Sequence, residues 1–118
     1  MTKLTCDILT KSNAVHLQQL FNGFNLLYKN GLADIRVRKT NFSGLPGNKP
    51  IVKVIVNDTH HLVYDLLDGY NFFDDSTIEE NLRFMDGLLE QCDYYYKRSF
   101  STRLNAQLVH RDKVRPLG

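Results

Sequence analysis

The fold is decided by residues 3 to 39, KLTCDILTKSNAVHLQQLFNGFNLLYKNGLADIRVRK. The first seven of these residues are mainly apolar and predict a short buried strand. Apolar side chains then recur at helical spacing, and Gly31 stands where a left-handed residue commonly ends a helix, so residues 13 to 30 are predicted to be helical. Residues 33 to 39 alternate between apolar and polar, as in a half-buried strand. Together these elements predict a βαβ unit with two parallel strands.

The next segment predicts a hairpin. Residues 40 to 50 contain two glycines, two prolines and two asparagines, which is typical of a loop. Residues 51 to 58 are rich in β-branched side chains, and residues 62 to 69 are apolar again. The gap between the two runs is too short for a crossover helix, so we expect antiparallel pairing with a turn at residues 59 to 61. That turn contains His60 and His61, which have no further ligands nearby in the sequence to suggest a metal site.

The remaining third of the chain continues the alternation of helices and strands. Ser76 and Glu79 have the spacing of a capping box, which predicts a second helix over about residues 77 to 91. We expect a strand at residues 93 to 96, a short helix within 101 to 110 and one more strand within 113 to 118. The sequence therefore predicts a single Rossmann-like three-layer α/β domain, with a mixed, mostly parallel sheet that includes a β-hairpin.

Composition and charge narrow the class of protein. The 118 residues are 42% hydrophobic and 24% charged, as in ordinary globular domains, and no apolar run approaches the roughly 20 residues of a spanning helix. The N-terminus lacks the long apolar region of a signal peptide, and Cys6 and Cys92 lie far apart, so we expect two reduced, buried thiols in a cytoplasmic protein. From Lys97 onwards there are six basic residues and one acid, which favours either a solvated tail or a surface for anions, including an anionic membrane surface. No nucleic-acid-binding signature is present, so nucleic acid is not expected as a partner.

Candidate binding residues follow the predicted strands. The sequence has no GxGxxG, P-loop, GxSxG or HExxH motif. The first strand-to-helix turn lacks glycine, but Ser12 and Asn13 would stand at the start of the helix, where free amides bind small anions or hydroxyls. Ligands of open α/β sheets bind beyond the carboxyl ends of the parallel strands. Polar side chains occur at two such places; they are Asp65 and Asp68 in YDLLDGYN, and Lys97, Arg98 and Ser99 in YYYKRSFS. The alternative is that both stretches are merely polar strand ends with their loops.

The order of these pieces resembles the N-terminal, acceptor-side half of a bacterial GT-B type glycosyltransferase of polysaccharide biosynthesis. The resemblance is carried by the opening strand and the helix ending in LLYKNG, by the hairpin leading into VYDLLDGYN, and by CDYYYKRSFS followed by RPLG. It spans nearly all of the chain with loose motifs, and the first turn departs from the family by lacking a glycine pair. The resemblance implies that residues 1 to 118 are the N-terminal portion of a longer two-domain protein whose second domain would bind the nucleotide-sugar donor. No cofactor and no metal are expected in this domain.

The resemblance also implies roles for individual residues. Ser12, Asn13, Lys97, Arg98 and Ser99 would bind the substrate, with the cations at the rim of the cleft, where they suit the phosphates of a glycan or lipid-linked acceptor. Asp68 would act as a catalytic base or orient the acceptor, and its structural alternative is to cap its own turn. We therefore expect Asp68 and residues 97 to 99 to meet at one end of the sheet. The competing hypothesis is a non-enzymatic α/β module, such as a regulatory or protein-interaction domain with a basic flank. We expect a cytoplasmic location, either free or at the membrane periphery.

Overall fold

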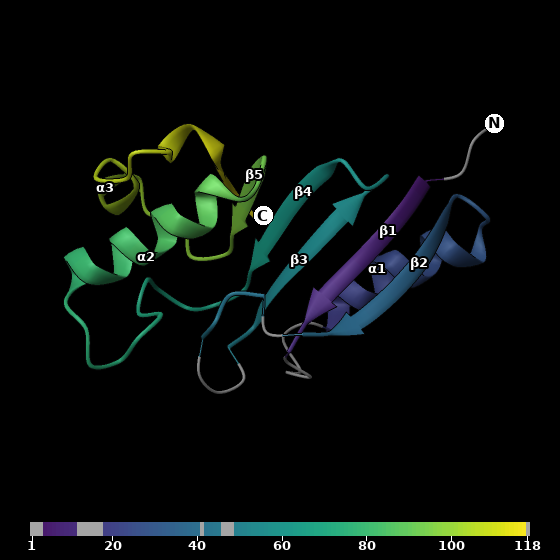
Figure 1. Cartoon of the computed structure of the whole chain (residues 1–118), viewed down its shortest axis with the longest axis horizontal. Helices are drawn as coiled ribbons and strands as arrows, with labels where there is room; N and C mark the ends of the chain where they lie inside the picture. Colours follow the sequence, from purple (N-terminus) through teal and green to yellow (C-terminus); the bar gives the residue numbers. More distant parts are fainter. Residues whose placement is uncertain (1–3, 12–17, 41, 46–48, 118) are drawn as a thin grey trace.

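The computed structural model describes residues 4–11, 18–40, 42–45 and 49–117. These residues form an α/β structure in which helices pack against one mixed sheet of six strands (Figure 1). The strand order across the sheet is β2-β1-β3-β4-β5-β6. Three of the neighbouring pairs, β1 with β2, β4 with β5 and β5 with β6, are parallel, and both pairs that involve β3 are antiparallel.

The N-terminal part confirms the predicted βαβ unit. Strand β1 (Leu4–Thr10) pairs in parallel with β2 (Ala33–Lys39), and α1 (Gln18–Lys29) connects them. Gly31 has a φ of +69° just after the helix, so the glycine supplies the left-handed residue that the sequence indicated. The first residues of the predicted helix, 13 to 17, lie outside the described residues.

The predicted hairpin is confirmed, but its turn lies earlier than expected. Strand β3 (Ile51–Val56) pairs with β4 (His60–Asp65) in antiparallel register. Asn57 and Asp58 both have positive φ values, 52° and 60°, as the two central residues of a type I′ turn do. Asn and Asp tolerate this conformation better than other non-glycine residues, which is why the chain turns here and not at residues 59 to 61. His60 and His61 consequently belong to β4.

The C-terminal part completes the sheet with two more parallel strands. Helix α2 opens it, and its cap differs from the prediction by one residue: Thr77 accepts a hydrogen bond from the backbone N–H of Glu80, whose side chain accepts one from the N–H of Thr77. The capping box is therefore Thr77–Glu80, and the Ser76–Glu79 assignment is wrong. The elements of this part are α2 (Ile78–Glu90), β5 (Tyr94–Lys97), α3 (Thr102–Asn105), the 3-10 helix η2 (Arg111–Lys113) and β6 (Val114–Pro116).

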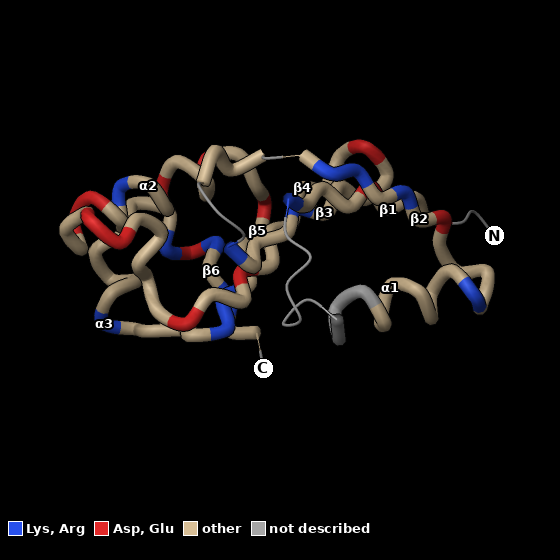
Figure 2. Tube along the Cα trace, turned by 90° about the horizontal axis from the view of Figure 1, so that it is seen from below, with Lys and Arg blue, Asp and Glu red and all other residues tan. Residues whose placement is uncertain are grey.

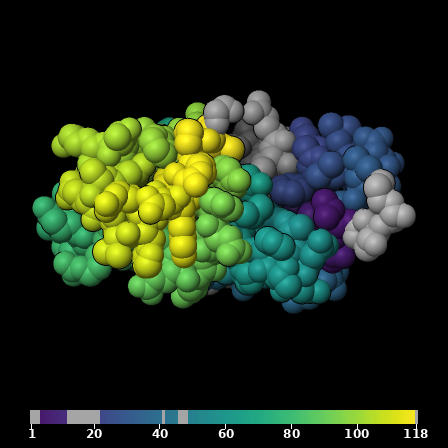
Figure 3. All heavy atoms as spheres, turned by 90° about the horizontal axis from the view of Figure 1, so that it is seen from above, coloured from purple at the N-terminus to yellow at the C-terminus, as the bar shows by residue number. Residues whose placement is uncertain are grey.

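Two hydrophobic cores lie on opposite faces of the sheet, because successive strand residues point to opposite sides. Ile51 and Val63 belong to the core beneath α2, whereas their neighbours Val52 and Val54 belong to the core beneath α1. Figure 2 shows the two helices on opposite sides of the sheet. The helices α1 and α2 also lie at opposite ends of the molecule, which measures 45 × 27 × 23 Å. The space-filling view shows the C-terminal segment away from the end that holds α1 and β2 (Figure 3).

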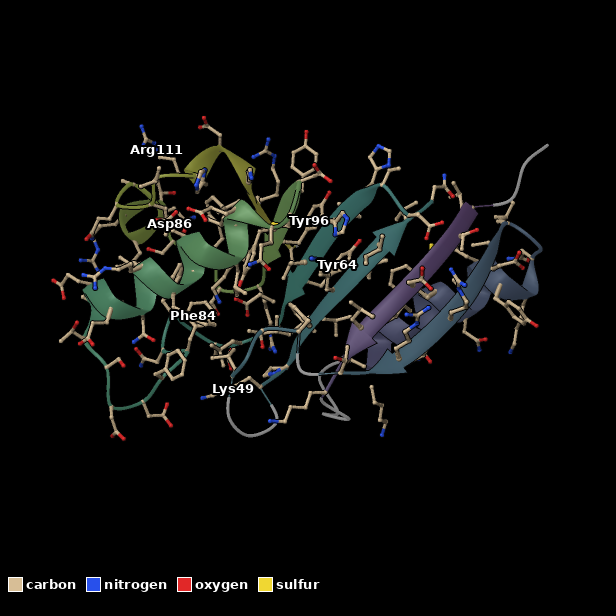
Figure 4. The ribbon with its side chains drawn as sticks, in the orientation of Figure 1. Lys49, Tyr64, Phe84, Asp86, Tyr96 and Arg111 are labelled. Carbon is tan, nitrogen blue, oxygen red and sulfur yellow. The ribbon has the colours of Figure 1, made fainter. Side chains whose placement is uncertain are left out.

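Side chains of α2 and its neighbours fix the C-terminal segment. Both carboxylate oxygens of Asp86, which Figure 4 labels on α2, accept a backbone hydrogen bond, one from Val109 and one from His110, each at 3.1 Å. The Lys113 ammonium donates to the carbonyl oxygen of Leu89 at 2.7 Å, near the C-terminal end of α2, where a helix favours positive charge. These contacts hold β6 beside β5, so the loops that follow both strands emerge at a defined edge.

The two cysteines are unpaired and buried, as the sequence predicted. Burial raises the pKa of Cys6, and it raises the pKa of Cys92 to about 11, so both thiols are protonated at neutral pH. None of the helices in the described residues is long and apolar enough to cross a membrane.

Candidate functional site

The candidate site lies where β4 and β5 end side by side. The two strands are parallel, and their last residues, Asp65 and Lys97, are register partners. Parallel strands deliver the loops that follow them to the same edge of the sheet, which is where ligands of open α/β sheets bind. The loop after β4 carries Asp68, and the loop after β5 carries Arg98 and Ser99, so the topology places these residues at one edge.

A buried ion pair forms the base of the site. The Lys97 ammonium lies 3.3 Å from Oδ2 of Asp65, and both side chains are completely buried. The Tyr95 hydroxyl donates to the same carboxylate oxygen at 2.5 Å, and the Lys97 ammonium lies 4.8 Å from the centre of the Tyr70 ring. Buried charges are costly unless they are paired and hydrogen-bonded, and here both charges have partners.

The same pair anchors the loop that follows β4. The backbone N–H of Leu67 donates to Oδ1 of Asp65 at 2.8 Å, and the Lys97 ammonium donates to the carbonyl oxygen of Leu67 at 3.0 Å. Gly69 has a φ of +88°, a conformation that other residues rarely adopt, and it lets the chain turn sharply after Asp68. The ion pair and the glycine together fix the loop that presents Asp68.

Burial has the largest effect on the pKa values of the buried side chains beneath the site. It raises the pKa of Asp65, while the nearby Lys97 and the hydrogen bond from Tyr95 act in the opposite direction. Burial likewise lowers the pKa of Lys97, and the attraction of Asp65 opposes that shift. The pKa of Tyr95 is raised well above its ordinary value by burial and by the adjacent carboxylate, so this phenol remains a donor. Each charge in the pair therefore depends on the presence of the other.

A small exposed cluster lies directly outside the buried pair. The Ser99 hydroxyl donates to Oδ1 of Asp68 at 3.5 Å, and Nε of Arg98 lies 3.9 Å from the same oxygen. The side chains of Asp68 and Arg98 are 82% and 48% exposed, so both are accessible to a ligand. We call Asp68, Arg98 and Ser99 the rim cluster. It combines a carboxylate, a guanidinium and a hydroxyl within reach of one bound molecule.

A buried polar contact supports the chain beyond the rim cluster. The Tyr70 hydroxyl donates to Oδ1 of Asn105 at 2.7 Å and accepts the backbone N–H of Ser101 at 3.0 Å. The Ser101 side chain accepts from the backbone N–H of Leu104 and so caps α3. Tyr70 therefore ties the loop after β4 to the helix after β5, and both flanks of the rim cluster are held.

The structure brings together three of the predicted site residues and places a fourth differently. Asp68, Arg98 and Ser99 are adjacent, as expected from the topology. Lys97, expected at the rim as an exposed cation, is instead buried beneath it, where it pairs with Asp65 and donates to the carbonyl oxygen of Leu67. Ser12 and Asn13 lie outside the described residues.

Sequence reasoning missed the residues that support the rim. The sequence marks Asp65 only as a polar residue near a strand end, and its partner follows only from the register of β4 and β5. The pair formed by Tyr70 and Asn105 joins residues 35 positions apart, and no local motif marks it. The signal that the sequence offers for the buried ion pair is an aspartate at the end of an apolar strand.

The chemistry available at the rim cluster is hydrogen bonding and charge recognition. A guanidinium and a hydroxyl donate to phosphate or carboxylate oxygens, and a carboxylate accepts from sugar hydroxyls. Within the described parts of the chain, no group of three or more His, Cys, Asp or Glu side chains is arranged to hold a metal ion. The rim cluster therefore fits a ligand that carries both an anionic group and hydroxyls.

Comparisons of the chain with protein-family models, curated proteins and solved structures give no match.

Proposed function

We propose that the rim cluster binds the acceptor of a glycosyl transfer, and that this chain is the acceptor-side domain of a glycosyltransferase. The observation that carries the proposal is the convergence of Asp68, Arg98 and Ser99 at the carboxyl edge of two parallel strands. This is the edge at which open α/β sheets bind ligands. The resemblance of the sequence to the acceptor-side half of GT-B enzymes supports the same assignment.

The ligand class follows from the chemistry of the three side chains. Arg98 and Ser99 are donors that suit the phosphate of a sugar phosphate or of a lipid-linked sugar. Asp68 accepts hydrogen bonds and suits a sugar hydroxyl beside that phosphate. In this proposal Asp68 orients the acceptor, because its side chain is largely exposed and lies beside Arg98 and Ser99, not in an apolar pocket that would favour a base.

The proposal includes a Rossmann-like assignment for the domain and a second domain for the donor. The βαβ unit and the parallel strands β4, β5 and β6 support the Rossmann-like assignment. The antiparallel strand β3 in the middle of the sheet departs from an all-parallel Rossmann arrangement. A nucleotide-sugar donor would bind a second domain outside these residues, so this domain alone is expected to bind an acceptor without transferring a sugar.

A second candidate function is a protein-interaction module. Large apolar side chains are exposed around the amino ends of β1 and β2, at Leu4, Leu26 and Leu32, with exposed fractions of 44%, 61% and 45%. The backbone N–H of Leu4 bonds to the carbonyl of Leu32, so these two residues are neighbours. Exposed apolar patches commonly mark interaction sites. This surface lies at the other end of the strands from the rim cluster, and the two functions are separable by mutation.

The acceptor proposal is tested by calorimetric titration with glucose 1-phosphate, a ligand that combines a phosphate with sugar hydroxyls. We expect a dissociation constant of about 1 mM for the wild type, or a binding free energy near −4 kcal/mol. Arg98→Ala should weaken the binding of glucose 1-phosphate about tenfold. Asp68→Asn should also weaken the binding of glucose 1-phosphate but leave the affinity for inorganic phosphate nearly unchanged. Arg83→Ala, which removes an exposed cation from α2, is the matched control. Equal affinity in the wild type and Arg98→Ala would refute the proposal.

A further inference from the structure

A cavity lies between α1 and the face of β1 and β2 that this helix covers, on the face of the sheet opposite to α2. Its volume is about 480 Å³, within the range of roughly 300 to 1,000 Å³ that is usual for small-molecule pockets. The walls come from three elements. The lining side chains are Ile8 and Thr10 from β1, Phe24, Asn25 and Tyr28 from α1, and Ile35, Val37 and Lys39 from β2.

Packing around Phe24 explains why this space is open. Phe24 and Tyr28 are one helical turn apart and both line the cavity. The Phe24 ring meets the ring of Tyr64 edge to face, with centroids 6.3 Å apart, and so packs toward the middle of the sheet (Figure 4 labels Tyr64). Strand β2 lies at the edge of the sheet, and Val37 on this strand is left 58% exposed, as is Tyr28 above it. Apolar walls therefore remain in contact with solvent, and a ligand that covers them is favoured by the burial of apolar surface.

The cavity has a charged end. Ile35, Val37 and Lys39 alternate along β2 and point to the same face, and Lys39 is the last residue of the strand. No acidic side chain is among the described residues that line the cavity, and no ion pair of Lys39 is found within the described parts of the chain. An apolar trough with one cation at its end complements an alkyl chain that carries an anionic head group.

We propose that this cavity binds a single-chain amphiphile, with its alkyl chain against Ile35, Val37 and Tyr28 and its anionic head group at Lys39. The head group is a phosphate or a carboxylate, since both accept hydrogen bonds from an ammonium. The site is separate from the rim cluster, which lies beyond the ends of β4 and β5, and it does not rest on the function proposed above.

The experiment is a calorimetric titration of the whole chain with dodecyl phosphate and with laurate, both below the concentrations at which they form micelles. Inorganic phosphate and dodecyltrimethylammonium serve as head-only and cationic probes. We expect both anionic amphiphiles to bind, and the one that binds more tightly identifies the preferred head group. We expect no binding of inorganic phosphate or of dodecyltrimethylammonium at this site. Absence of binding by both anionic amphiphiles, or equal binding by the cationic one, would overturn the site.

Two substitutions and a matched control locate the site. Lys39→Glu should weaken binding of the anionic amphiphiles about tenfold, and Val37→Gln should do so by a similar factor because an apolar wall becomes polar. Arg38→Glu makes the same change of charge one residue away, on the opposite face of β2, and should change the affinity less than about threefold. Far-UV circular dichroism confirms that each variant is folded. Equal weakening by Lys39→Glu and Arg38→Glu would show general charge attraction and contradict a built site.

Discussion

Replacing Lys97 with methionine tests the buried pair that supports the rim cluster. The substitution keeps a long side chain but leaves the Asp65 carboxylate buried with no cation. Because both side chains are completely buried, the free energy of unfolding at pH 7 should fall by about 3–5 kcal/mol, the usual cost of breaking a buried ion pair from one side. With a urea dependence of about 2 kcal/mol per M, the unfolding midpoint should drop by about 2 M. Lys29→Met, which removes an exposed lysine from α1, should change stability by less than about 1 kcal/mol.

The pH dependence of this loss has a definite sign. Burial already raises the pKa of Asp65 in the folded state, and removing Lys97 takes away the attraction that lowers it, so the folded-state pKa rises further. The native protein then binds this proton more tightly than the unfolded chain, whose carboxyl has a pKa of about 3.9. The resulting stability is fully present below that unfolded value and is lost as the pH rises through the folded value. The deficit of Lys97→Met should therefore shrink as the pH falls from 7 toward 4.

The reciprocal variant should behave in the opposite way. Asp65→Asn leaves the Lys97 ammonium buried without its carboxylate, so its folded-state pKa, already lowered by burial, falls further below the unfolded value of about 10.4. Between those two values the unfolded chain binds more protons, so stability rises with pH. The loss in free energy of unfolding caused by Asp65→Asn should therefore shrink toward pH 10. The loss in the double variant should be smaller than the sum of the losses in the two single variants. Urea unfolding followed by circular dichroism measures all four proteins. Single deficits below about 1 kcal/mol with no pH dependence would refute the reasoning.

Three further predictions concern the fold. Thr77→Ala should lower the free energy of unfolding, measured with urea, by about 1 kcal/mol because it removes the cap of α2, whereas Ser76→Ala should change it little. A larger loss in Ser76→Ala than in Thr77→Ala would show that Ser76 caps the helix. Asp58→Val should lower the melting temperature because a β-branched residue resists a φ of 60°, and Asp58→Gly should not lower it; equal effects would contradict the type I′ turn. Cys6 and Cys92 should react with a thiol reagent only after unfolding, and fast labelling of the native protein would show that they are not buried.

Much of the fold was predictable because local patterns and long-range packing agree. The β-branched run at residues 51 to 56 forms a strand whether it is judged by propensity or by burial, and the βαβ unit follows from the spacing of apolar residues. The cap of α2 was not settled by local pattern, because Ser76–Glu79 and Thr77–Glu80 have the same spacing. The structure selects Thr77, and the buried Asn81 amide supports that choice by donating to the carbonyls of Thr77 and Phe73.

The candidate site was predictable only in its exposed part. That Asp68, Arg98 and Ser99 share an edge follows from the direction of parallel strands, and this the sequence indicates. The burial of Lys97 depends on which face of β5 is covered and on the residue opposite it in β4. Tyr95 and Lys97 share a face by alternation, but the cover by α2 and the pairing with Asp65 are tertiary facts. The local sequence, a lysine after three tyrosines, therefore predicts an exposed cation. The register of β5 with β4 instead makes Lys97 the buried partner of Asp65.

The most direct test of the acceptor site is to map the backbone amides that respond to glucose 1-phosphate in nuclear magnetic resonance spectra of the labelled protein. We expect the largest shift changes on residues 67 to 70 and 98 to 101, which surround the rim cluster. Arg98→Ala should remove these changes, and Arg83→Ala should not. Shift changes concentrated on α1 and β2, or unchanged in Arg98→Ala, would show that this edge of the sheet does not bind the acceptor.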